Sequence, residues 1–109
     1  MNRINANTKE AGSMAYAFTQ DVPIKADVHR KITDRLGPTP LKGLIVHVAS
    51  ATPAGTLRYT DVWESKELCD QAFAERIDPA MMDVFKEIGF KLDSQPERRE
   101  LNLVDVMRG

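Results

Sequence analysis

The chain has 109 residues, and its 42% hydrophobic and 28% charged residues are typical of a single globular domain. Its formal net charge of −1 gives no electrostatic reason to expect a nucleic acid or an anionic membrane as partner. No apolar run reaches the roughly 20 residues of a membrane helix, and the N-terminal residues lack the apolar core of a secretion signal. The single cysteine, Cys69, excludes an intrachain disulfide, so we expect a cytoplasmic protein.

The first half of the chain predicts a tail, a strand and a helix. Residues 1–13 are polar and predict a disordered tail ahead of a single domain over residues 14–109. Residues 14–22 alternate in polarity and predict a strand that carries Tyr16 on one face.

The following helix is indicated by apolar residues that recur every four positions. The pattern spans residues 25–36 and comprises Val28, Ile32 and Leu36, which form an apolar stripe. His29 lies at the margin of this stripe, where we expect it to face solvent.

A central hairpin is predicted by two apolar segments on either side of turn residues. Residues 43–51 predict a buried strand in which His47 is the polar exception, and residues 52–55 supply the turn. Residues 56–63 predict the second strand. Its alternation gathers four side chains on one face: Leu57, Tyr59, Asp61 and Trp63.

The second helical region begins at Ser65, whose hydroxyl can cap a helix over residues 65–77. Pro79 disfavours helical geometry at the residue before it, so we expect a break or kink near Asp78. A further helical segment then runs to Gly89.

Residues 100–107 predict the last strand, and the complete order is strand, helix, strand, strand, helix, strand. This order predicts an α+β, ferredoxin-like βαββαβ fold with a four-stranded antiparallel sheet in spatial order 4-1-3-2 and both helices on one face. The other face carries small and apolar residues, namely Ala15, Ala17, Val62, Val104 and Val106. We expect a second copy to cover that face, which predicts a homodimer.

Residues 14–107 resemble the dimeric α/β-barrel superfamily and, within it, the antibiotic-biosynthesis-monooxygenase-like (ABM) domains. The resemblance rests on Gly43-Leu-Ile-Val-His-Val, on Tyr59-Thr-Asp-Val-Trp-Glu-Ser-Lys-Glu and on the strand order. It implies a pocket between sheet and helices, with Trp63 in the position of a pocket tryptophan. It also implies a monooxygenase that needs no cofactor and acts on a phenolic, quinol or polyketide-like aromatic substrate. The haem-degrading branch ligates haem through a histidine of the second helix, and residues 65–89 contain none.

Five residues are candidates for the site. His47 and Asp61 could exchange a proton with a substrate, since imidazole titrates near neutrality and a carboxylate can take or orient a proton. Trp63 could stack on a flat ligand, and Tyr16 and Tyr59 could donate hydrogen bonds to a carbonyl or quinone oxygen. Each could equally be a structural residue. No metal-ligand spacing is present.

Two function classes follow from these residues. One is an enzyme without a cofactor, either an oxygenase or an isomerase or cyclase that moves a proton beside a carbonyl. The other is a non-catalytic dimer that binds a small ligand or accompanies another enzyme. If His47, Asp61 and a tyrosine converge on a cavity, catalysis is favoured. A filled apolar core favours the second class.

Overall fold

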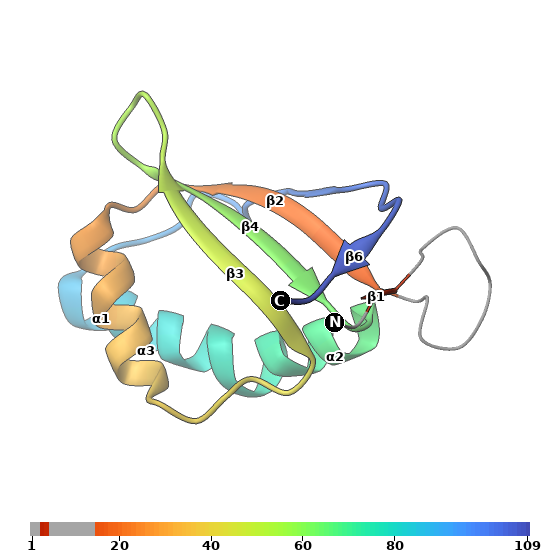
Figure 1. Cartoon of the computed structure of the whole chain (residues 1–109). Coiled ribbons are helices and arrows are strands. Elements are labelled where there is room, and N and C mark those ends of the chain that lie inside the picture. The colour runs from red at the N-terminus through yellow and green to blue at the C-terminus, as the bar shows by residue number, and fades with distance from the viewer. Residues whose placement is uncertain (1–2, 5–14) are drawn as a thin grey trace.

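A computed structural model describes residues 3–4 and 15–109 of the chain (Figure 1). The elements in chain order are β1 (Arg3–Ile4), β2 (Tyr16–Val22), α1 (Ala26–Leu36), β3 (Leu44–Ala51), β4 (Leu57–Trp63), α2 (Lys66–Ala72), a π-helical turn (Phe73–Ile77), α3 (Asp78–Ile88), β5 (Arg98–Glu100) and β6 (Val106–Met107). None of the helices in this described part combines the length and apolar character needed to cross a bilayer.

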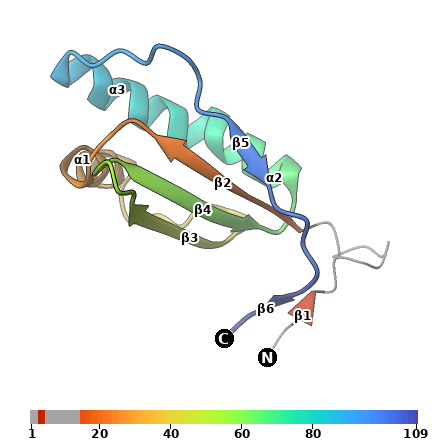
Figure 2. The same ribbon diagram turned by 90° about the horizontal axis from the view of Figure 1, so that it is seen from above.

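The main sheet has four strands in the order β3-β4-β2-β5, and every neighbouring pair is antiparallel. The expected four-stranded antiparallel sheet of an α+β fold is therefore confirmed. Ile32 of α1 and Val84 of α3 share one core cluster with Leu57 of β4, so both helices cover the same face of the sheet. The views in Figures 1 and 2 agree with this two-layer arrangement.

The helical region from α2 to α3 is continuous, but it is irregular at the position where we expected a break or kink. Asp78 has helical dihedral angles, and its N–H bonds to the carbonyl of Phe73, five residues earlier. This wider turn comes just before Pro79, whose ring would clash with the carbonyl four residues back in a regular α-helix. The proline is thus accommodated by a π-turn over Phe73–Ile77, and α3 ends at Gly89 in the left-handed conformation.

The end of the chain differs from the single strand expected over residues 100–107. Only β5 joins the main sheet, beside β2, and β6 pairs with β1 instead. Figure 2 shows β6 and β1 beyond the end of the four-stranded sheet. Arg3 and Ile4 thus have strand structure because β6 supplies backbone partners. The remaining residues of the expected tail lie outside the described residues.

On the outer face of the sheet, the burial of the side chains differs from the prediction. Strand β3 was expected to be buried, yet all its residues from Val46 onward are exposed, because β3 lies at the edge of the sheet. Val46 and Val48 are 44% and 48% exposed. The segment around Val106 does lie near Val62 on this side, so the chain covers part of the face itself.

Two buried clusters form the core between the sheet and the helices. One gathers Ile24, Ile32, Leu57, Ala80, Val84 and Phe85. The other gathers Tyr16, Phe18, Trp63, Cys69 and Ala72. Residues of both clusters line one cavity. The core is thus divided in two by a space that a ligand could occupy.

Candidate functional site

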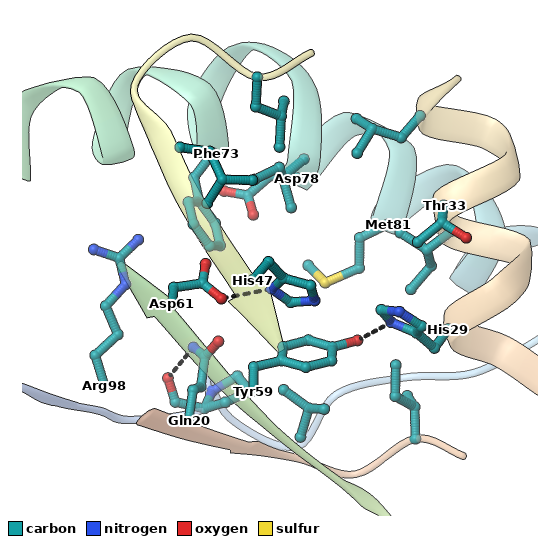
Figure 3. A pocket seen from close by; sticks show the side chains of 18 of the residues that line it. Gln20, His29, Thr33, His47, Tyr59, Asp61, Phe73, Asp78, Met81 and Arg98 are labelled. Carbon is teal, nitrogen blue, oxygen red and sulfur yellow. Dashed lines mark hydrogen bonds and ion pairs between the residues drawn. The ribbon is translucent and has the colours of Figure 1, made fainter. Parts of the chain in front are cut away.

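The cavity has a volume of about 450 Å³ and lies between the inner face of the sheet and the helices (Figure 3). This volume is in the range of sites for small organic ligands. Most of the lining is apolar, with Ile32 and Leu36 from α1 and Met81 and Phe85 from α3. Polar side chains also line this space, and β3, β4 and α1 supply both imidazoles together with Tyr59 and Asp61.

Strand β4 places three of the expected residues on the cavity side, as its alternation predicts. Tyr59, Asp61 and Trp63 all line the cavity. Trp63 is 0% exposed, and its indole N–H donates to Oδ2 of Asp61 over 3.1 Å. Since no surface of the indole is open, Trp63 backs the wall of the cavity and holds Asp61, and does not offer a free face for stacking.

His47 and Asp61 form the closest polar pair of the site. They are directly opposite each other in the β3–β4 register, and Nδ1 of His47 lies 2.5 Å from Oδ1 of Asp61. A carboxylate can only accept, so Nδ1 carries the proton and donates it. In the neutral imidazole, the second ring nitrogen, Nε2, then has a free lone pair. Asp61 itself is 3% exposed, and its two oxygens receive one hydrogen bond each, from His47 and Trp63.

A bulge in β3 brings His47 to this position. The register shifts between Leu44 and Val46, so Ile45 is an extra residue in the strand. Leu44 and His47 both line the cavity although they are three positions apart, which a regular strand would put on opposite faces. The bulge is therefore what combines an apolar lining residue and an imidazole on the same side.

The hydrogen-bond partner of Tyr59 is His29, which the sequence pattern predicted to face solvent. The hydroxyl of Tyr59 lies 2.7 Å from Nδ1 of His29, and both residues line the cavity. The expectation that His29 faces solvent is wrong, because α1 turns this position toward the sheet. Burial, and next the charge of Asp61, raises the pKa of Tyr59 to about 12. Burial, and next the charge of His47, lowers the pKa of His29.

Three aromatic rings meet at this point of the cavity, as Figure 3 shows. The rings of His29 and His47 are nearly parallel, 17° apart, with centroids separated by 5.7 Å. The ring of Tyr59 meets His47 edge-on at 4.8 Å. Two imidazoles from different elements thus lie side by side, His29 bonded to a phenol and His47 to a carboxylate.

The far end of the cavity is formed by Arg98, which sequence reasoning also missed. Its guanidinium lies 4.6 Å from the ring centre of Phe73 and 4.8 Å from that of Phe18, and it donates to Asp70 over 2.9 Å. Tyr16, an expected substrate-binding residue, is 8% exposed and accepts a 3.5 Å hydrogen bond from Arg98. It is not among the cavity-lining residues, so the structure does not bring it to the site.

Asp78 lines the same cavity from the start of α3. Burial raises the pKa of its carboxyl group, and Arg98 partly opposes this shift. The π-turn determines where this side chain points, so the sequence carries no direct signal for it. Among residues 3–4 and 15–109, no three or more His, Cys, Asp or Glu side chains are grouped in a way that could hold a metal ion.

Comparisons with known proteins bear on the fold. No protein-family model matches the sequence, and no curated protein sequence matches it. The structure is similar to that titled "Crystal structure of a conserved protein from Methanosarcina mazei Go1", with 13% identity and a TM-score of 0.51 over 81% of this chain and 91% of that one. At this identity the likeness concerns the fold alone.

Proposed function

We propose that this protein is a cofactor-independent enzyme that binds a small phenolic or quinol-type aromatic molecule and removes its hydroxyl proton, after which O2 oxidises the anion. The observation that carries the proposal is the His47–Asp61 pair, which is built into a largely apolar cavity of about 450 Å³. Convergence of His47, Asp61 and a tyrosine on a cavity favours an enzyme, whereas a filled apolar core would favour a non-catalytic protein.

His47 has the role of general base in this proposal. Asp61 accepts from Nδ1, which fixes the tautomer and leaves Nε2 as the proton acceptor. Trp63 fixes Asp61 in turn through the 3.1 Å hydrogen bond of its indole. The base is thus oriented by a carboxylate, and the carboxylate is itself held by a buried indole.

The apolar lining serves the remaining steps. It binds the aromatic rings of the substrate and excludes water from the anion. With 1-naphthol as substrate, the hydroxyl proton goes to Nε2 of His47 and the anion reacts with O2 at the para carbon. Loss of water from the resulting hydroperoxide gives the quinone, so one O2 is consumed and one water released per naphthol.

We propose, in addition, that the subunit is ferredoxin-like in the manner of the ABM domains and forms a homodimer through the outer face of its sheet. The strand order β3-β4-β2-β5 supports the first part. The exposure of Val46 and Val48 on a sheet face supports the second, since contiguous exposed apolar side chains mark interaction surfaces. The assembly would be a dimeric α/β barrel.

Oxygen uptake with 1-naphthol tests the proposed activity. We expect uptake by the wild type, and a loss of at least about 100-fold in His47→Gln, which removes the base. Lys31→Gln is the control, because Lys31 is exposed on α1 and does not line the cavity. If naphthol binds, as judged by Trp63 fluorescence, but no oxygen is consumed, the protein belongs to the class of non-catalytic ligand-binding or accessory dimers. An equal rate in His47→Gln would refute the role of the base.

A further inference from the structure

His29 is a second imidazole in the cavity, and its hydrogen bond determines which of its nitrogens carries the proton. The hydroxyl of Tyr59 lies 2.7 Å from Nδ1 of His29. Burial raises the pKa of Tyr59 to about 12, so the phenol keeps its proton and can donate it to Nδ1 of His29. A neutral imidazole that accepts at Nδ1 carries its proton at Nε2. When Tyr59 donates, His29 therefore has an N–H group that Tyr59 does not occupy.

His47 has the opposite arrangement. Asp61 accepts from its Nδ1, so its Nε2 is an acceptor. The two rings lie on the cavity side by side, with centroids 5.7 Å apart and planes at 17°. The cavity thus offers one hydrogen-bond donor and one proton acceptor, held on α1 and β3 by Tyr59 and Asp61 respectively.

The spacing of the rings limits how a ligand can meet them. A flat ring inserted between two others needs a centroid separation of roughly 7 Å, twice the contact distance of about 3.5 Å. The two imidazoles are closer than that, so a ligand cannot lie between them. It therefore meets the pair from outside, where the donor of one ring and the acceptor of the other can contact the same ligand.

We propose that His29 is a catalytic hydrogen-bond donor to a carbonyl oxygen, and that the cavity accepts ketones with an acidic hydrogen on the adjacent carbon. Nε2 of His47 takes this proton, and the C–H electron pair forms the new C=C bond. The π pair of the carbonyl moves to its oxygen, which accepts from Nε2–H of His29. Return of the proton to carbon restores the ketone, so the step needs no oxidant. This inference rests on the proposed function only for the role of His47 as base.

The role of Tyr59 in this step is to position His29. Without the hydroxyl, the proton of a neutral imidazole can reside on either nitrogen, and the ring can turn. With it, the N–H that faces the ligand is fixed before the ligand binds, and such preorganised donors stabilise a developing oxyanion most effectively.

Deuterium exchange at C1 of 2-tetralone, followed by NMR in D2O, tests the proposal. We expect the wild type to accelerate exchange, His29→Leu to be slower by about 100-fold, as for loss of one oxyanion donor, and Tyr59→Phe to show a smaller loss. His29→Gln should recover most of the rate, because its amide oxygen can accept from Tyr59 while its NH2 group donates to the ketone. Lys31→Gln is again the control, and thermal unfolding verifies that each variant is folded.

The outcomes separate this inference from the proposed function. An unchanged rate in His29→Leu, with a large loss in His47→Gln, would overturn the role of His29 and leave the base in place. No acceleration by the wild type, together with oxygen uptake from 1-naphthol, would overturn the ketone class alone. Equal exchange rates in the wild type and His47→Gln would overturn the base and with it both proposals. Loss in His29→Leu without recovery in His29→Gln would reduce His29 to a packing residue.

Discussion

The two faces of strand β4 carry polar side chains in opposite circumstances. On the inner face, Asp61 is 3% exposed and receives hydrogen bonds from His47 and Trp63. On the outer face, Arg58 is exposed and pairs with Asp21 of β2 over 2.7 Å. The bond between Trp63 and Asp61 is buried at both ends, whereas both partners of the outer pair are open to water. Because side chains alternate along β4, the strand places a buried carboxylate on the cavity side and a solvated ion pair on the outer face.

The largest effect should come from the inner face, at Trp63. We expect Trp63→Ala to lower the free energy of unfolding by about 3–5 kcal/mol, because the side chain is 0% exposed and its indole also holds Asp61. Urea denaturation measures the change. Arg58→Ala, on the opposite face of the same strand, should leave the midpoint unchanged. A loss at Trp63 of well under 2 kcal/mol would mean that the wall of the cavity is not packed as the structure shows.

The next largest effect should come from Asp61→Ala, which we expect to lower the free energy of unfolding by about 3 kcal/mol. Removing the carboxylate leaves the buried indole N–H of Trp63 without its acceptor and takes the partner of Nδ1 from the more exposed His47. The matched control is Asp21→Ala, which also removes an aspartate with two side-chain partners, here the cationic Arg58 and Arg99, but at the surface. Denaturation curves for the two variants should differ clearly. If they coincide, the burial of Asp61 contributes nothing to stability.

The contrast between the faces was largely predictable from the sequence, because it follows from strand period. The alternation of residues 57–63 places Tyr59, Asp61 and Trp63 together, and the structure has them on the cavity. The helix over residues 26–36 and the antiparallel hairpin were predictable for the same reason, since their periodicities are long and regular.

The rest depends on tertiary structure. The bulge at Ile45 leaves no mark in a run of apolar residues, yet it decides that His47 faces the cavity with Leu44. His29 could not be assigned because a small rotation of the helix about its axis turns a residue at the margin of the apolar stripe from solvent toward the cavity, and only the packing of α1 on the sheet decides the rotation. The π-turn before Pro79 and the departure of the chain from the sheet after Glu100 depend likewise on neighbouring segments.

The exposed apolar side chains of the outer face lead to a prediction about the oligomeric state. If two copies associate there, the wild type should sediment with about twice the 12.2 kDa mass of the chain. Val48→Asp would bury a charge in the interface and should shift the protein to a monomer at micromolar concentration. Met82→Asp is the control, because Met82 is also largely exposed but lies on α3. A monomeric wild type would overturn the proposed dimer.

The smallest effect is a titration at high pH. Burial raises the pKa of Tyr59 from about 10 to about 12, and the unfolded chain keeps the ordinary value. The folded state therefore retains a proton that the unfolded state loses, so the contribution to stability is complete below about pH 10 and disappears as the pH rises to about 12. Absorbance of ionised tyrosine should show a late step for Tyr59.

That step should vanish in Tyr59→Phe, which leaves Tyr16 as the remaining tyrosine. The variant also removes the donor to His29, so the imidazole should titrate differently in NMR spectra of the same protein. A late step that persists in Tyr59→Phe would assign the perturbed phenol to Tyr16. The inner face would then lack the permanent donor that fixes the His29 tautomer, and the difference between the two imidazoles of the cavity would have no structural cause.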